Sequence, residues 1–154
     1  MTLTFLIIIL LLLSALQVRL PALPGLGVHL EFIPALVAYS ALTLSRPGIF
    51  AFALAAGLTQ DALSAGPFGV SALVYVILAL LLHRFRGALD RDLPVLQIGA
   101  GLLVALVAGI VGSGVAGFPA GTTLKLFYLS LLSAFITPVL FFALDYLRYQ
   151  WRPA

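Results

Sequence analysis

The chain contains no cysteine and very little charge, and these two absences exclude several classes of protein. Without cysteine there are no disulfides, no thiolate metal ligands and no cysteine nucleophiles. Only 8% of the 154 residues are charged, whereas 63% are hydrophobic and the mean hydropathy is +1.22. A water-soluble domain of this length cannot bury so much apolar surface, so we expect most of the chain to lie in a lipid bilayer.

Long hydrophilic stretches are also absent, so we expect a single polytopic membrane domain over residues 1–154. The net charge of +3 is spread over short loops, and we therefore interpret it as topology information and expect no nucleic-acid partner. Residues 3–16 have the length of a signal peptide. No basic stretch precedes them and no Ala-x-Ala site follows, so they are predicted to form the first membrane helix.

Apolar segments alternate with turn signals such as Arg46-Pro47-Gly48 and Gly66-Pro67. Six of these segments are predicted to be helices: about 3–18, 31–45, 48–63, 68–83, 94–116 and 122–147. The pattern predicts an all-α integral membrane protein, a compact bundle of about six transmembrane helices. The second, third and fourth segments are shorter than the roughly 20 residues of a straight span. Two interpretations therefore remain: thin, closely packed spans, or a re-entrant pair over 31–63.

Basic residues separate cleanly in the six-helix arrangement. One side would carry Arg46, Arg84, Arg86, Arg91, Arg148 and Arg152, and the other only Arg19 and Lys125. The positive-inside rule then predicts a multi-pass membrane protein with both termini in the cytoplasm and the 61–67 turn outside. A re-entrant pair would leave Arg46 among the poorly charged outer loops, so we favour six full spans.

The segment 57–71, GLTQDALSAGPFGVS, is the most informative because it places polar groups within apolar sequence. Asp61 is one of five acidic residues, and a carboxylate at bilayer depth costs about 2.5–3.5 kcal/mol. One interpretation is structural: Asp61 or Ser64 satisfies backbone groups of the following turn, and Asp61 accepts a hydrogen bond from Ser71. The other is functional, with Gln60 and Asp61 presented to a partner or ligand. The candidate motif comprises Gln60, Asp61, Ser64, Gly66, Pro67 and Gly69.

Small residues recur at a spacing of four in segment 94–116 and form two overlapping faces. The first face has Gly101, Ala105 and Gly109, and the second has Ala108, Gly112 and Ala116. Small residues let helix backbones approach closely in lipid. They predict either an interface with a partner helix or packing against the chain's own neighbours, and we favour the second because a small bundle needs a central helix.

No constellation of residues supports catalysis, so we predict a non-enzymatic protein without metal or cofactor. His29 and Glu31 lie in an outer loop and supply two metal ligands without a third. His83 lies among arginines at a cytoplasmic helix end. Asp61 and Asp145, the carboxylates available for an aspartyl dyad, are predicted on opposite sides of the membrane. Phosphate-binding motifs are absent as well.

The pattern Gly57-x-x-Gln60-Asp61-x-x-Ser64-x-Gly66-Pro67-x-Gly69-x-Ser71-Ala72 resembles the signature stretch of the bacterial rod shape-determining protein MreD family. Phe32-Ile33-Pro34 and the basic run His83–Arg86 extend the resemblance. It implies an inner-membrane component of the cell-elongation machinery that binds MreC directly. Through MreC such a protein connects to MreB, RodA and the elongation transpeptidase during lateral peptidoglycan synthesis. The family brings no catalytic or cofactor residues.

The family is also similar in structure to the substrate-binding S components of energy-coupling-factor vitamin transporters, and this supplies an alternative function. The first helix of such a subunit usually carries an Ala-xxx-Ala docking face. Residues 3–18 are instead rich in Ile and Leu. A vitamin site also needs several convergent polar groups, and the outer half of this chain offers few beyond Glu31, Gln60, Asp61 and Ser64.

Overall fold

The structure is a computed structural model that describes residues 2–21, 30–64, 67–87, 93–117 and 122–150. Its elements are α1 (Thr2–Arg19), α2 (Ile33–Thr43), α3 (Arg46–Leu63), α4 (Val70–Phe85), α5 (Pro94–Ala116) and α6 (Thr122–Gln150). No strand occurs within the described ranges. The all-α class with six helices is therefore confirmed.

Helix boundaries differ from the sequence expectation by at most three residues, most informatively at α3. This helix begins at Arg46 and not at residue 48, with Pro47 and Gly48 inside its first turn. Proline is tolerated there because the N–H groups of a first turn have no partner within the helix. α2 is shorter than expected at both ends, α4 is shifted by two residues, and α6 continues to Gln150.

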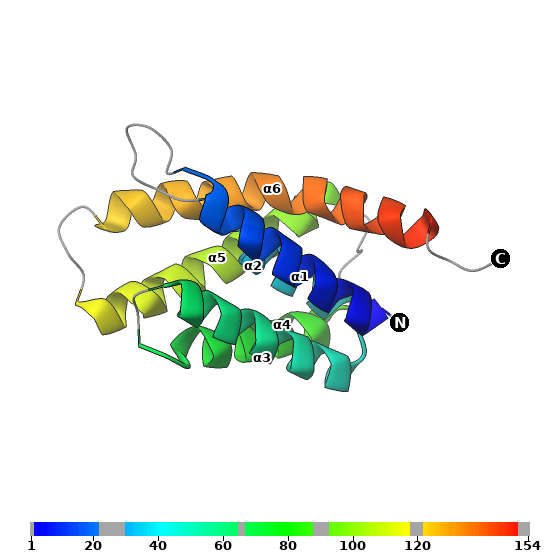
Figure 1. Ribbon diagram of the computed structural model, residues 1–154, viewed down its shortest axis with the longest axis horizontal. Helices are drawn as coiled ribbons and strands as arrows, with labels where there is room; N and C mark the ends of the chain where they lie inside the picture. The colour runs from blue at the N-terminus through cyan, green and yellow to red at the C-terminus, as the bar shows by residue number, and fades with distance from the viewer. Residues whose placement is uncertain (1, 22–29, 65–66, 88–92, 118–121, 151–154) are drawn as a thin grey trace.

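Successive helices run antiparallel, so the bundle has two distinct ends (Figure 1). The first, which we call the turn end, holds the ends of α1, α3 and α5 and the starts of α2, α4 and α6. The start of α1 and the end of α6 lie together at the opposite end, which we call the termini end. Among the described basic residues, Arg46, Arg84, Arg86 and Arg148 fall at the termini end and Arg19 and Lys125 at the turn end. Arg91 and Arg152 lie outside the described residues.

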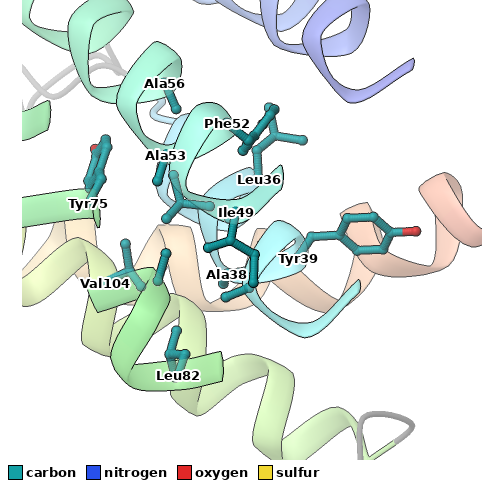
Figure 2. Close-up of a cluster of buried hydrophobic side chains, with 14 of the residues drawn as sticks. Leu36, Ala38, Tyr39, Ile49, Phe52, Ala53, Ala56, Tyr75, Leu82 and Val104 are labelled. Carbon is teal, nitrogen blue, oxygen red and sulfur yellow. The ribbon is translucent and has the colours of Figure 1, made fainter. Parts of the chain in front are cut away.

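α2 is the central helix of the bundle, although it is the shortest. All of its residues from Ile33 to Leu42 are buried, and the other five helices pack around it. Figure 2 shows Leu36 of α2 beside Phe52 of α3, in the cluster that also contains Ile49. Eleven residues span only about 16 Å at 1.5 Å per residue. α2 needs no greater length, because its whole surface is covered by protein.

Within the described ranges, two helices are long and apolar enough to cross a membrane: residues Pro94–Val115 of α5 and Thr123–Gln150 of α6. Their most apolar stretches are only 22% and 33% buried within the bundle, so most of each stretch lies on the surface of the described structure. The apolar helices Leu3–Arg19, Ile33–Thr43 and Val70–Phe85 are shorter. Large apolar side chains are exposed on every helix except α2.

Candidate functional site

The Asp61 carboxylate, which the sequence singles out, joins the end of α3 to the start of α4. It is buried, at 4% exposure, and it accepts two backbone hydrogen bonds. The Gly69 N–H donates to Oδ2 at 2.7 Å and the Ser71 N–H donates to Oδ1 at 3.1 Å. The first N–H groups of a helix have no partner within it and carry partial positive charge. Asp61 therefore caps α4 from a neighbouring helix.

Glycine at position 69 makes this capping geometry accessible. Gly69 is the N-cap residue of α4, its φ is +97°, and it has no side chain with which to cap the helix. A residue with a Cβ is strained at that φ, whereas glycine adopts it freely. The backbone can therefore turn sharply into α4 while both N–H groups point back at Asp61.

A second glycine brings the two helices close enough for the contact. A Cβ added at Gly57 would lie 2.5 Å from the backbone nitrogen of Ala72 and 2.8 Å from the carbonyl carbon of Ser71. Backbone atoms cannot move aside as a flexible side chain can. Gly57 thus sets the separation of α3 and α4 one turn before Asp61, and the same residue begins the motif that carries the family resemblance.

The other motif residues occupy different surroundings. Gln60 is half-buried, whereas Ser64 and Pro67 are exposed at the turn end. The Ser64 hydroxyl donates a long hydrogen bond, 3.4 Å, to the Asp61 carbonyl oxygen. Gly66 lies outside the described residues. Phe68, between Pro67 and the α4 cap, has a large apolar side chain that is 72% exposed.

Glu31 and Gln60 form a second polar group at the turn end, which the sequence alone did not pair. A hydrogen bond joins their side chains. Burial raises the pKa of the Glu31 carboxyl to about 7, and the hydrogen bond to Gln60 acts in the opposite direction. The Gln60 Oε1 atom is buried and accepts no hydrogen bond from the described residues.

Tyr75 links the two polar groups. Its side chain, from α4, is 1% exposed, and its hydroxyl lies within electrostatic reach of both Glu31 and Asp61. Residues from the start of α2, the end of α3 and the first half of α4 thus place two carboxyl groups, an amide and a phenol in one region. Among the described residues, no three His, Cys, Asp or Glu side chains come together as a metal-binding group.

Of the small residues on α5, the first face packs against α6. A Cβ added at Gly101 would overlap the Thr137 side chain, with Thr137 Cβ 2.8 Å away, and one added at Gly109 would lie 2.7 Å from Leu126 Cδ2. Ala105 is buried between them. The second face differs: a Cβ at Gly112 would meet nothing within 4 Å. The side chain of Ala116 lies outside the described set.

The termini end has polar contacts of its own, which link residues far apart in the chain. The Tyr39 hydroxyl donates to Asp145 Oδ1 at 2.8 Å, and its ring packs edge-on against Phe141 with centroids 4.9 Å apart. Figure 2 shows Tyr39 pointing away from α3 and toward α6. The Arg86 guanidinium donates to the Leu44 carbonyl at 3.3 Å. These contacts fix α2 to α4 and α6, and local sequence patterns do not predict them.

An apolar groove of about 380 Å³ also opens at this end, between α4 and α5. Its lining is Leu81, Leu82, Phe85, Leu96, Gly99, Ala100 and Leu103. With no polar side chain in its lining, the groove offers hydrophobic contact alone and no group for chemistry. It lies at the opposite end of the bundle from the polar cluster, so the two features do not form one site.

Comparison of the chain with family models, with curated proteins and with solved structures of known proteins gives no match.

Proposed function

We propose that this chain is a non-enzymatic inner-membrane component of the bacterial cell-elongation machinery, a scaffold of the MreD type that binds MreC. Support comes from the α3–α4 hairpin. Gly57, Asp61 and Gly69 carry the resemblance in the sequence, and in three dimensions they form one unit that fixes the turn. A motif that joins the end of α3 to the start of α4 and leaves Pro67 and Phe68 exposed, without a catalytic group, suits a surface that another protein recognises.

In this proposal all six helices are embedded in the bilayer, with both termini in the cytoplasm. The distribution of arginine supports this orientation, because the described arginines concentrate at the termini end and cytoplasmic loops favour basic residues. α2 lies at the centre of the bundle. Its short helix is compatible with the bilayer because α1 and α3–α6 cover it.

The partner-binding surface would be the tip of the turn, not Asp61 itself. Asp61 is buried and occupied by two backbone donors, whereas Ser64, Pro67 and Phe68 are exposed. The role of Asp61 in this proposal is to hold Phe68 in place for a periplasmic segment of MreC. The other elongation proteins, MreB, RodA and the transpeptidase, would be reached through MreC.

A mild-detergent pull-down of the tagged full-length chain from native membranes, analysed by mass spectrometry, tests the function. We expect recovery of MreC with other elongation proteins. Phe68→Ala should weaken that recovery, while Leu73→Ala, which removes an exposed side chain from α4 near the same turn, should not. Recovery of the tagged chain without MreC would reject the proposal. Equal recovery of MreC by the Phe68→Ala and Leu73→Ala variants would reject the turn as the contact.

The alternative, a vitamin-binding S component, has one observation in its favour. The buried, unpartnered Gln60 Oε1 lies beside Glu31, and buried acceptors of this kind can orient a small polar ligand. Recovery of a paired ATPase with a transmembrane coupling subunit in the same pull-down would favour it. So would thermal stabilisation of the purified chain by one vitamin, provided that Gln60→Leu abolishes the effect.

A further inference from the structure

α6 presents a continuous stripe of apolar side chains to the surroundings of the bundle. The stripe contains four aromatic residues at a spacing of seven: Tyr128, Phe135, Phe142 and Tyr149. They are 40%, 63%, 76% and 77% exposed, and Leu131, Val139 and Tyr146 lie exposed between them. We call these seven residues the α6 seam. A repeat of seven keeps one face of a helix toward a partner helix over several turns.

The α6 seam lies opposite the face with which α6 packs on its own chain. At 100° per residue, the buried residues of α6 fall on the other side of the helix: Ser130, Ser133, Ala134, Thr137, Leu140, Phe141 and Leu144. These residues lie on the side of α6 that packs against α5 and α2, so the seam faces away from both helices. No charged residue occurs in 126–144, so charge does not oppose close approach along this stretch.

The dimensions of the seam match a bilayer. From Tyr128 to Tyr149 the rise is about 32 Å at 1.5 Å per residue, close to the roughly 30 Å hydrocarbon thickness. Both end positions are tyrosine and both middle positions are phenylalanine. Tyrosine favours the headgroup level and phenylalanine the hydrocarbon, so each ring lies at the depth it prefers.

We infer that the α6 seam is a self-association surface on which a second copy of this chain docks in a parallel, two-fold symmetric pair. Copies of one protein inserted in the same orientation necessarily present their α6 helices in parallel. A two-fold axis along the seam then places each aromatic residue beside its own counterpart, and no separate complementary sequence is required. A helix of another protein would need a matching register, for which this chain gives no indication.

The exposed area is large enough for close packing between two copies, and packing is what holds helices together in lipid. With about 150–250 Å² for a fully buried aromatic side chain, the four seam aromatics leave roughly 400–600 Å² available to a partner. The available area grows toward the roughly 800 Å² per partner of a standard interface when Leu131, Val139 and Tyr146 are included. This inference uses the membrane embedding proposed above, but it does not depend on the elongation role.

Disulfide cross-linking tests the seam directly, because the natural chain has no cysteine. Full-length chains carrying Phe135→Cys or Phe142→Cys would be oxidised in vesicles that contain no other protein, at a high lipid-to-protein ratio. We expect covalent dimers at these positions and none for Leu73→Cys, a comparably exposed position on α4. Equal cross-linking at Leu73→Cys, or none at the seam, would overturn the inference.

Removing the seam rings provides a second measurement. The double variant Phe135→Ala/Phe142→Ala should lower the dimer association constant in vesicles by about tenfold or more, because two layers of ring contacts are lost. The matched variant Leu73→Ala/Ile77→Ala should leave the association constant unchanged. The helical content and the elution volume of the monomer are compared for the two variants, to show that both are folded. An unchanged association constant, or seam cysteines that cross-link in native membranes to a different protein only, would contradict a second copy as the occupant. Loss of MreC from the pull-down would leave these results unaffected.

Discussion

The α3–α4 and α5–α6 hairpins are both antiparallel helix pairs whose close approach depends on glycine, yet they are secured differently. In α3–α4, Gly57 lies against the backbone of Ala72, and Asp61 then closes the turn through two hydrogen bonds. In α5–α6, Gly101 and Gly109 face the side chains of Thr137 and Leu126.

The difference shows how a polar group can be used where apolar attraction is weak. Lipid provides no hydrophobic force between helices, so packing and hydrogen bonds decide which surfaces meet. The α3–α4 hairpin combines both, and its geometry is fixed at the turn. The α5–α6 hairpin relies on packing, and the outer face of α6 remains exposed. One hairpin is thus held by backbone contacts where α4 begins, and the other presents a long apolar side.

The largest effect should come from Gly57→Ala. The added methyl would overlap backbone atoms of Ala72, and these cannot yield without separating α3 from α4. We expect a loss of about 3 kcal/mol or more in the free energy of unfolding, at the upper end of overpacking costs, or failure to accumulate in the membrane. Denaturant titration in micelles measures it, with Gly99→Ala as the control because a Cβ there meets nothing within 4 Å. Equal stability of the two variants would show that the hairpin is less tightly packed.

Asp61→Ala should have the next largest effect. It leaves the N–H groups of Gly69 and Ser71 without their acceptor in a buried site, at a cost of about 2–4 kcal/mol. Asp61→Asn keeps one acceptor oxygen and should lose about half as much. Hydrogen exchange at Gly69 and Ser71 should accelerate more in the alanine variant than in the asparagine variant. Unchanged exchange at these two amides would contradict the capping role.

A smaller effect is expected for Gly101→Ala, because the obstacle is a side chain. The new methyl would meet the Thr137 hydroxyl and methyl groups, for an expected cost of about 1–2 kcal/mol. Thr137→Ala in the same chain should restore part of that loss. Gly112→Ala, on the same helix with open space around it, should be neutral or stabilising by up to about 1 kcal/mol. If Gly101→Ala and Gly112→Ala changed the stability by the same amount, α5 would not pack on α6 through the face that contains Gly101.

The smallest effect concerns pH and Glu31. The carboxyl pKa is about 7 in the folded chain and 4.5 in the reference state, so between these values the folded chain retains a proton that the unfolded chain releases. Stability should therefore fall as pH rises from about 4.5 to 7 and then level off, with a slope well below the limit of about 1.4 kcal/mol per pH unit. Glu31→Gln should flatten this part of the profile. A slope that survives the substitution would assign it to another group.

The sequence predicted the elements better than it predicted their contacts. Segment 94–116 coincides with α5, because its apolar run is long and Pro94 and Gly117 mark its ends. α3 starts earlier than expected because Pro47 is as compatible with a first turn as with a break between helices. At the site, the sequence identified Asp61 and its turn. It did not pair Glu31 with Gln60 or Tyr39 with Asp145, since those contacts join separate helices.

The sequence alone determined that the chain is helical and largely apolar, where its six helices lie, and which residues are too polar or too small to be incidental. These properties follow from local composition and spacing. The tertiary structure decided that α2 is the buried centre and that Asp61 caps α4. It also decided that Gly57 faces the backbone of α4, that Gly101 faces a side chain of α6, and that the α6 seam faces outward. Such properties depend on which helices are neighbours and on their separation, and local spacing does not encode either quantity.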